Sequence, residues 1–293
     1  MNEPLATPQD TLDPKTFRKF CDLVYDTAGI TLGPQKEALV SARMGKRMRK
    51  LGMHSFEEYY HFVEGDSSGT ELVEMLNAIS TNVTHFFREP RHFDVLARLL
   101  RSWADEGQRV FRIWCAASST GEEPYTLAMT VREAIPDCRD IKILATDIST
   151  KVLATAQAGI YEDRHVEKVP DHLLRKYFAR ISGTSKSAPG EGAGANSRDQ
   201  VACVRYQASE SLRGILTFAR LNLAKPPFAM RGPFDAIFCR NVMIYFDNEV
   251  RRNLLSECQR LLRPGGYLIV GHAESLSGML SNFRSVEPAV YVK

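Results

Sequence analysis

Asp147 is the first residue whose type and position point to chemistry. It follows the apolar run Ile141–Ala145, which is expected to form a buried strand, so its carboxylate should stand at the end of that strand. An acid at this place in an α/β fold can accept hydrogen bonds from both ribose hydroxyls of an adenosine. The plainer alternative is that Asp147 only caps the following helix, as Asp often does.

The loop that follows another apolar run, Val110–Cys115, consists of small residues. Its Ala-Ala-Ser-Ser stretch at 116–119 would let a ligand approach the backbone closely. Gly121 is the single glycine between positions 110 and 127, so the GxGxxG cradle for a pyrophosphate is missing. A dinucleotide is therefore disfavoured, and a cofactor without phosphates is favoured. A turn made of small residues for steric reasons alone is the alternative.

A third polar position is formed by Arg240 and Asn241, which directly follow the apolar run Phe234–Cys239. Parallel strands present their carboxyl ends at one edge of a sheet, so these side chains should lie on the same side as Asp147. The segment Leu262–Val270 reads as a helix stop, a Pro-Gly-Gly turn and a strand, and its turn is interpreted as structural. Together the three positions predict a pocket for an adenosine-containing cofactor.

The first 80 residues contain apolar side chains at helical spacing only. Three stripes, at positions 17–24, 56–63 and 72–79, follow the i, i+3, i+4, i+7 pattern. Residues 35–51 also have helical period, with Leu39, Ala42 and Met48 or Leu51 expected to face a core. Glycines separate these pieces, so the segment is predicted to be a small helical domain.

From about residue 90 the pattern changes to strand-like runs that alternate with helical stretches. Such alternation indicates a mostly parallel sheet with helices on both faces. The stretch 182–199 interrupts it, being rich in Gly, Ser and Ala, and is predicted to be a mobile loop. Strand-like pieces at Tyr177–Ile181 and Val201–Tyr206 flank this loop, so an inserted antiparallel hairpin is expected.

Composition excludes several classes of protein. A net charge of +3 is too small to indicate nucleic-acid binding by the whole chain, and no run approaches the roughly 18 apolar residues of a membrane span. No targeting segment is visible, and the six cysteines are scattered, as in reduced cytosolic proteins. The seven histidines show no HExxH spacing, so no metal site is expected. We therefore expect a cytoplasmic protein that does not insert into the membrane.

Six segments in order closely resemble the chemotaxis receptor methyltransferases, the CheR family. They are TNVTHFFREP (81–90), WCAASSTGEEPYTLA (114–128), ATDIS (145–149), FARLNL (218–223), FCRNVMIYF (238–246) and LRPGGYLIVGHAES (262–275). Each motif alone is weak, but six in sequence over nearly the whole chain are specific. The resemblance implies a protein-glutamate O-methyltransferase that uses S-adenosylmethionine, releases S-adenosylhomocysteine and tunes chemotaxis adaptation.

The fold implied by the resemblance is α/β, namely a Rossmann-like methyltransferase domain preceded by a small all-α domain. The expected boundaries are a helical substrate-docking domain at 1–80, a linker that closes over the cofactor at 81–92, and the methyltransferase domain at 93–293. A small antiparallel β-subdomain is expected as an insertion at 175–218. In the family this subdomain can bind a C-terminal peptide of the receptor, but the long loop here departs from the family pattern.

The resemblance also assigns residues to roles. Glu122 would contact the methionine part of the cofactor and Asp147 its ribose, while Arg88 and Tyr245 would orient the substrate carboxylate as the catalytic pair. The full set of implied cofactor-binding residues is Asn82, Thr84, Arg88, Glu122, Asp147, Asn222, Leu223, Arg240 and Asn241. Asn82, Thr84 and Arg88 also have a plain interpretation, as a polar linker turn before a helix.

A cationic helix face stands apart from the pocket. Arg43, Lys46, Arg47 and Lys50 follow i, i+3, i+4, i+7 spacing, which places them on one face. Such a face is often merely solvated, but the implied substrate is a receptor coiled coil that carries glutamates. A basic face would attract that coiled coil and set its register, so a docking role is favoured.

Two other functions remain open from the sequence. The chain could be a methyltransferase that acts on RNA or on a small molecule, in which case the cationic helix would bind phosphate. It could also be a regulatory protein that binds the cofactor without turnover. The receptor methyltransferase is preferred, and no nucleic-acid partner is expected.

Overall fold

The computed structural model describes residues 11–79, 84–184, 202–274, 276, 279 and 283–293 of the 293-residue chain. Asn82 and residues 185–199 of the expected loop lie outside these residues. In the described part no helix is long and apolar enough to cross a lipid bilayer.

The N-terminal part is helical, as predicted. Its elements are α1 (Pro14–Ala28), the 3-10 turn η1 (Pro34–Lys36), α2 (Glu37–Leu51), α3 (Phe56–Gly65) and α4 (Thr70–Ile79). Asp13 begins α1 because its carboxylate accepts hydrogen bonds from the backbone N–H groups of Lys15 and Thr16. Gly29 ends α1 with φ at 67°, a conformation that favours glycine. Phe20, Tyr59 and Met75 form the centre of the helical core.

The expected orientation of α2 was partly right. Met48 is buried as expected, but Leu39 is 41% exposed and Ala42 is also exposed, and Val40 and Met44 are buried instead. The period was right, and α2 packs against α4 and α3 through the face that contains Val40, Met44 and Met48. Leu39 is thereby free to line a pocket between the helical part and the sheet.

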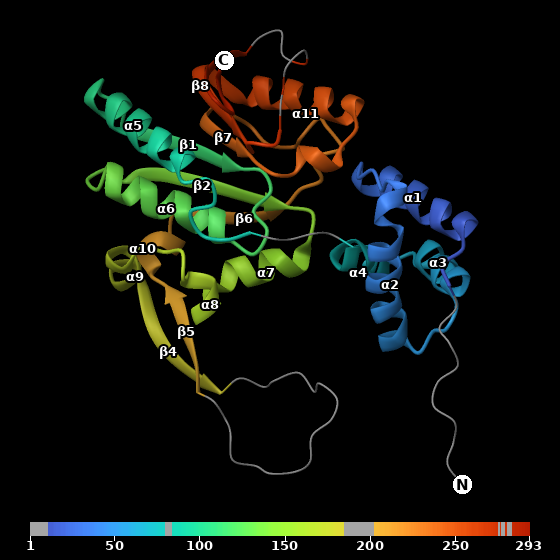
Figure 1. The fold of residues 1–293 in the computed structure, drawn as a ribbon. Coiled ribbons are helices and arrows are strands. Elements are labelled where there is room, and N and C mark those ends of the chain that lie inside the picture. Colours follow the sequence, from blue (N-terminus) through green and yellow to red (C-terminus); the bar gives the residue numbers. More distant parts are fainter. Residues whose placement is uncertain (1–10, 80–83, 185–201, 275, 277–278, 280–282) are drawn as a thin grey trace.

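The second part contains a seven-stranded sheet in the order β6-β2-β1-β7-β8-β10-β9 (Figure 1). Strands β6, β2, β1, β7 and β8 are parallel, and β10 is antiparallel to both β8 and β9. The strands are β1 (Val110–Cys115), β2 (Asp140–Asp147), β6 (Leu216–Arg220), β7 (Phe234–Cys239), β8 (Leu262–Val270), β9 (Arg284–Glu287) and β10 (Val290–Val292).

Helices cover both faces of this sheet. They are α5 (Arg91–Asp105), α6 (Glu122–Ala134), α7 (Thr150–Ala158) and α11 (Asn248–Leu261), with a 3-10 turn η2 (Met243–Tyr245) before α11. Successive strand residues point to opposite faces, so Ile113 and Phe238 pack with α5 and α6, whereas Trp114 and Ile237 pack with α11. These two cores explain why the strands read as continuous apolar runs.

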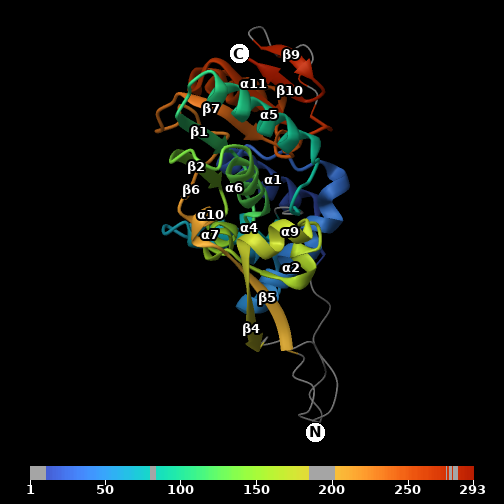
Figure 2. The same ribbon diagram turned by 90° about the vertical axis from the view of Figure 1, so that its left-hand side faces the viewer.

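A second, three-stranded antiparallel sheet extends away from the large one (Figures 1 and 2). Its elements and neighbours are β3 (Ile160–Glu162), α8 (Asp163–Val166), α9 (Asp171–Tyr177), β4 (Phe178–Thr184), β5 (Ala202–Ala208) and α10 (Glu210–Arg213). The hairpin is confirmed, but the expected range 175–218 began too late, since β3 pairs with β5. It also ended too late, because residues 216–218 belong to β6 and pair with β2.

The helical part lies beside the carboxyl ends of the parallel strands (Figure 1). Tyr25 donates a hydrogen bond to Asp247 at 2.5 Å, and Asn222 donates one to the carbonyl of Thr27 at 2.6 Å. The chain order reverses between neighbouring strands β1 and β7, which is where open α/β sheets bind ligands. The helices therefore cover the edge at which a ligand site is expected.

The helical part should depend on a partly buried ion pair between α2 and α4. Glu71 accepts hydrogen bonds from Arg47 and from the Tyr59 hydroxyl, and its side chain is 7% exposed. Glu71→Ala should lower the free energy of unfolding by about 3 kcal/mol, because a guanidinium and a phenol lose their buried partner. Glu74→Ala is the matched control, since Glu74 lies 3.6 Å from Arg47 but is 37% exposed. Urea denaturation measures both; equal losses would contradict this role of Glu71.

Candidate active site

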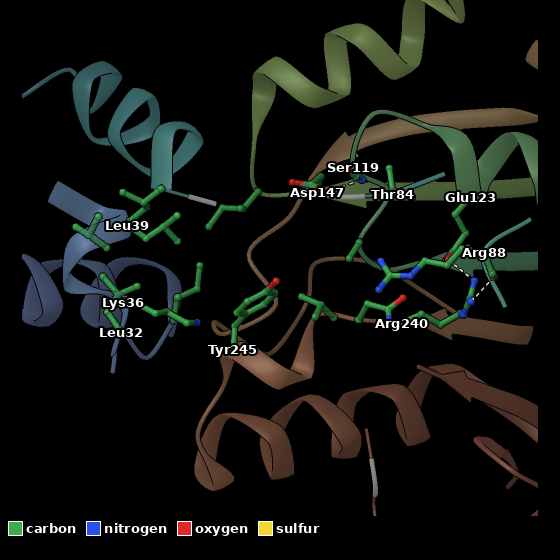
Figure 3. Close-up of a pocket in the computed structure, with 17 residues that line it drawn as sticks. Leu32, Lys36, Leu39, Thr84, Arg88, Ser119, Glu123, Asp147, Arg240 and Tyr245 are labelled. Carbon is green, nitrogen blue, oxygen red and sulfur yellow. Dashed lines mark hydrogen bonds and ion pairs between the residues drawn. The ribbon is translucent and has the colours of Figure 1, made fainter. Parts of the chain in front are cut away.

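A pocket of about 990 Å³, including its open mouth, lies between the helical part and the large sheet. Both parts of the chain line it (Figure 3). The polar or charged lining residues are Lys36, Thr84, Arg88, Ser119, Glu123, Asp147, Arg240, Asn241 and Tyr245. Of the nine residues expected to bind the cofactor, Thr84, Arg88, Asp147, Arg240 and Asn241 are in this set.

Asp147 lies at the end of β2 and faces the pocket. Its two carboxylate oxygens accept hydrogen bonds from the backbone N–H groups of Ser119 and Ser149, both at 2.9 Å. Burial raises the pKa of Asp147, although these backbone hydrogen bonds oppose the shift. Ser149, rather than Asp147, caps α7 by accepting from the N–H of Val152. The carboxylate is thus fixed, and each oxygen retains capacity for a ligand hydroxyl.

An adjoining apolar pocket continues from Asp147. It is lined by Ile148, Leu221, Leu223 and Val242, and it shares Asp147 and Tyr245 with the first pocket. Asn222 also lines it, but its amide donates to the carbonyl of Thr27 and accepts from the N–H of Ala224. Asn222 therefore shapes the wall, and the apolar surfaces beside Asp147 suit an adenine ring. S-adenosylmethionine fits this combination of a carboxylate acceptor and apolar surfaces.

Arg240 is fully buried and points away from the pocket interior. Its guanidinium donates to Glu123 at 2.6 Å and to the carbonyl of Arg88 at 2.5 Å (Figure 3). It also donates to Glu89 at 3.0 Å. Burial is the largest single effect on the pKa of Glu89 and raises it, but the hydrogen bond and positive charge of Arg240, together with Asn241 and His272, lower that pKa overall. For Glu123, burial is the larger effect and its pKa is raised. Arg240 thus holds the linker that contains Arg88 in place.

The two adjacent acids at the start of α6 lie in different surroundings. Glu122 is buried and accepts a hydrogen bond from the Thr120 hydroxyl at 2.7 Å, and Glu123 lines the pocket. Neighbouring residues of a helix point about 100° apart, which explains this difference. The contact of Glu122 with the methionine part of the cofactor, which the resemblance implies, stays a prediction.

Backbone strain is concentrated around the pocket. Phe87, Glu89, Ser119 and Asn241 all have φ between 46° and 57°, which is uncommon for residues with a Cβ. Strained backbone tends to cluster at binding sites, where the surrounding structure holds it in place. These four residues belong to the linker, the β1–α6 loop and the end of β7, so the strain marks the three segments that form the site.

Glu274 is an important positioning residue that the sequence did not single out. Its carboxylate accepts hydrogen bonds from the backbone N–H groups of Asn241, Met243 and Gly271, each at 2.7 Å. A Cβ at Gly271 would lie 2.5 Å from the Asn241 amide nitrogen, so this turn needs glycine. The turn after β8 therefore fixes the segment that leads to Tyr245. No periodicity or motif spacing would have signalled this contact.

Arg88 and Tyr245, the expected catalytic pair, line the same pocket. The Arg88 side chain extends into the pocket interior, and the Tyr245 ring stands at its edge near the helical part (Figure 3). The ammonium of Lys36 lies 4.8 Å from the centre of the Tyr245 ring. The contact of Lys36 with Tyr245 arises from the packing of the two parts.

The cationic face of α2 is smaller than expected. Lys46 and Lys50 are exposed, but Arg47 is 16% exposed and forms a bidentate pair with Glu71. Arg43 is half-buried and donates to the carbonyl of Ile79 at 2.8 Å. The spacing was right, but helix α4 packs on one side of this face, and its residues form hydrogen bonds with two of the four cations.

Comparison with known proteins agrees with this geometry. Residues 15–80 match the family model described as CheR methyltransferase, all-alpha domain, and residues 82–191 and 193–292 match that described as CheR methyltransferase, SAM binding domain. The chain is 37% identical to a chemotaxis protein methyltransferase of Salmonella typhimurium, covering 94% of this chain and 88% of that protein. It is 36% identical to one of Borreliella burgdorferi, covering 92% and 91%.

Both family models together span nearly all of the chain, and the pocket lies where the two matched domains meet. The seven-stranded sheet, the small antiparallel sheet and the helical domain also have the arrangement that the resemblance implied. The chain therefore belongs to the CheR methyltransferase family and is an S-adenosylmethionine-dependent methyltransferase.

Proposed function

We propose that this enzyme acts in the cytoplasm and transfers the methyl group of S-adenosylmethionine to glutamate side chains of chemoreceptors, which tunes chemotaxis adaptation. The observation that carries this proposal is the position of Arg88, which extends into the same pocket as Asp147. The reaction needs an acid that can bind the ribose of the cofactor and a cation that can bind the substrate carboxylate.

Residues of the sheet edge hold the cofactor in this proposal. Asp147 accepts hydrogen bonds from the ribose hydroxyls, and the adjoining apolar pocket at Leu221 and Leu223 takes the adenine ring. Thr84 and Arg88 of the linker cover the site from the other side. When bound, the cofactor supplies a sulfonium methyl group that is open to attack by an oxygen nucleophile.

Arg88 and Tyr245 position the substrate carboxylate. A guanidinium binds a carboxylate with paired hydrogen bonds, and the phenol can donate another to the same group. Lys36 over the Tyr245 ring adds positive charge at the pocket wall. These contacts would align one carboxylate oxygen with the methyl group. Alignment of the reacting atoms is the main way in which positioning lowers the barrier.

No general base is needed for this reaction. A glutamate side chain with an ordinary pKa near 4.3 is already ionised at pH 7, so its oxygen is the nucleophile as it arrives. Attack by this anion on a cationic centre reduces both charges along the path. A pocket that excludes water therefore favours the reaction, provided that Arg88 orients the carboxylate without overstabilising it.

Helix α2 connects the pocket with the proposed docking surface. Leu39 lines the pocket mouth, and Lys46 and Lys50 follow at i+7 and i+11 on the same side of the helix. At 1.5 Å per residue this line is about 16 Å long, enough to follow several turns of a receptor helix. Exposed lysines would attract the glutamates of a receptor coiled coil and align it with the pocket.

The small sheet offers a second contact for the receptor. Among the described strands, β4 pairs on one side only, with β5, so its other edge can accept an extended peptide as a further strand. A receptor C-terminal peptide is the proposed ligand of that edge. Such a tether would raise the local concentration of the receptor without entering the pocket.

Cofactor binding should require the Asp147 carboxylate. Loss of a charged acceptor costs roughly 1.5–3 kcal/mol, so Asp147→Ala should weaken binding of S-adenosylhomocysteine about 10- to 150-fold. Because only the ionised form accepts both hydroxyls, parental affinity should fall as the pH drops through the raised pKa of Asp147. Asp147→Asn should lose this pH dependence. Calorimetry checks both, with exposed Asp137→Ala as the control; parental affinity in Asp147→Ala would refute the ribose contact.

Arg88 and Tyr245 should matter for turnover rather than for folding. With labelled cofactor and a receptor cytoplasmic fragment, the parent should form base-labile methyl esters. Arg88→Ala should lower kcat/KM by about 100-fold, because a misplaced carboxylate loses its alignment. Tyr245→Phe keeps the ring beside Lys36 and should lose about tenfold, the value of one hydrogen bond. Either variant working at the parental rate, with unchanged thermal unfolding, would remove that residue from the catalytic pair.

Charge reversal on α2 should impair capture of the receptor and leave the chemical step intact. Lys46→Glu with Lys50→Glu should raise the KM for the receptor at low salt and flatten its salt dependence, because exposed charges are screened over about 8 Å at physiological salt. The matched control reverses two exposed lysines of the methyltransferase domain, Lys142 and Lys168, with the same change in net charge. If both double variants behave alike, the α2 lysines are only a solvated face.

A further inference from the structure

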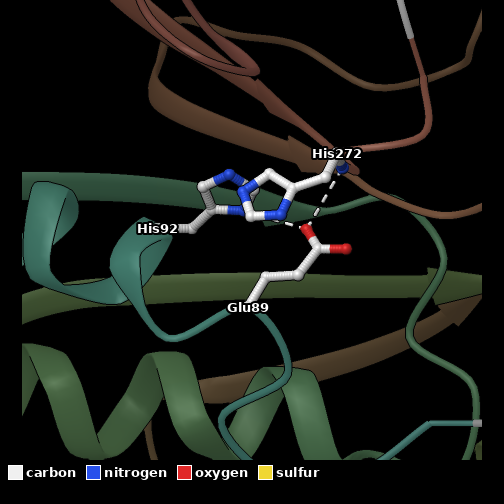
Figure 4. Close-up of side chains that lie close together, drawn as sticks. All are labelled: Glu89, His92 and His272. Carbon is white, nitrogen blue, oxygen red and sulfur yellow. Dashed lines mark hydrogen bonds and ion pairs between the residues drawn. The ribbon is translucent and has the colours of Figure 1, made fainter.

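Glu89, His92 and His272 form a cluster of possible metal ligands behind the pocket (Figure 4). Glu89 belongs to the linker, His92 to the first turn of α5 and His272 to the turn after β8. Their ligand atoms all lie within 4.8 Å of one another, although 183 residues separate Glu89 from His272 along the chain. Histidine spacing in the sequence could not indicate this group, because the ligands come from opposite ends of the methyltransferase domain.

His92 is the unusual member of the cluster. It is 1% exposed, and among the described residues neither of its ring nitrogens has a hydrogen-bond partner. Nδ1 lies 3.4 Å from an oxygen of Glu89, and the His272 ring stands edge-on at 4.8 Å between ring centres. A buried polar group without a partner destabilises the folded state, so its presence needs an explanation.

We propose that Glu89, His92 and His272 bind a divalent transition metal ion, with Zn²⁺ as the best match. Two imidazoles and one carboxylate are a common set of protein ligands for zinc, with a water molecule in the fourth position. Imidazole nitrogens disfavour Mg²⁺ and Ca²⁺, which prefer oxygen ligands. A metal ion would give the buried His92 ring the partner that it lacks.

The geometry is close to that of a metal site. Tetrahedral zinc with bonds of about 2.0–2.1 Å places its ligand atoms roughly 3.3–3.5 Å apart. The longest separation of 4.8 Å must therefore contract, and the exposed His272 side chain is the one that can rotate toward the others. The same exposed side gives a metal ion its path from solvent.

The charges around the cluster also accept a cation. Arg240 lies 3.0 Å from Glu89, but Glu123 lies 2.6 Å from Arg240 on its other side. With both carboxylates ionised, the three groups carry a net charge of −1. Asn241 lies 3.4 Å from the other Glu89 oxygen, so the carboxylate is oriented by its neighbours, as metal ligands usually are. Glu89 would then be shared between Arg240 and the metal ion.

A bound metal would stabilise the arrangement of the segments behind the pocket. It would join the linker residue after Arg88 to the turn at 271–274, whose Glu274 fixes Asn241 and Met243. Binding to the folded state alone stabilises it in proportion to metal concentration. Zn²⁺ should therefore raise the melting temperature of the whole protein, whereas Mg²⁺ at the same concentration should not.

The test uses the full chain without an affinity tag. Titration with Co²⁺ should produce visible d–d absorption at one equivalent, and Zn²⁺ should displace it. His272→Ala should weaken binding of both ions at least about tenfold, since even outer-shell partners change metal affinity 10- to 100-fold. His61→Ala is the matched control, because His61 also lies 3.4 Å from a glutamate but has no second histidine beside it. That variant should bind as the parent does.

The metal affinity of His272→Ala is the deciding measurement, because His272 is exposed and its removal should not disturb folding. His92→Gln is the second variant. Absence of Co²⁺ absorption in the parent, or affinity unchanged by His272→Ala, would overturn the site. A strong near-ultraviolet thiolate band would also overturn it, by assigning the metal to a cysteine. All readouts are of metal binding rather than of methyl transfer, so a negative result leaves the proposed function untouched.

Discussion

Burial of the Arg240 guanidinium is the interaction on which the rest of the site depends. A fully buried cation is stable only when its hydrogen bonds and its charge are satisfied, and Arg240 takes its partners from two separate segments. Glu123 starts helix α6, Glu89 lies in the linker, and the Arg88 carbonyl is one residue before it. Movement of the linker away from the sheet edge would therefore leave the buried Arg240 charge without two of its partners.

The pocket belongs to neither part of the chain alone. The sheet contributes Asp147 and Asn241, whereas the helical part contributes Lys36 and Leu39. Contacts such as Tyr25 with Asp247 and Asn222 with the Thr27 carbonyl join the two parts around it. A partner that docks on the helical part is thus presented directly to the reacting centre, which suits a large protein substrate better than a free small molecule.

Patterns along the chain predicted the architecture well because burial imposes a period on the residues that experience it. The alternation of strands and helices, the edge position of Asp147 and the β4–β5 hairpin were all predicted in this way. Strand β3 and the stripe of α2 were missed or misassigned for different reasons. β3 is three residues long, too short for a period, and in α2 Leu39 and Val40 are equally apolar, so only packing against α4 decides which is buried.

By itself the sequence determined the family, the fold and the sheet edge at which the pocket lies, since these follow from local residue types in a fixed order. Tertiary structure decided how individual polar side chains are used. Glu123 lines the pocket whereas Glu122 does not, and Arg47 pairs with Glu71. His272 lies beside Glu89 and His92. These outcomes depend on which charges are buried together, and the free energy of a buried charge is set by neighbours that are distant in the chain.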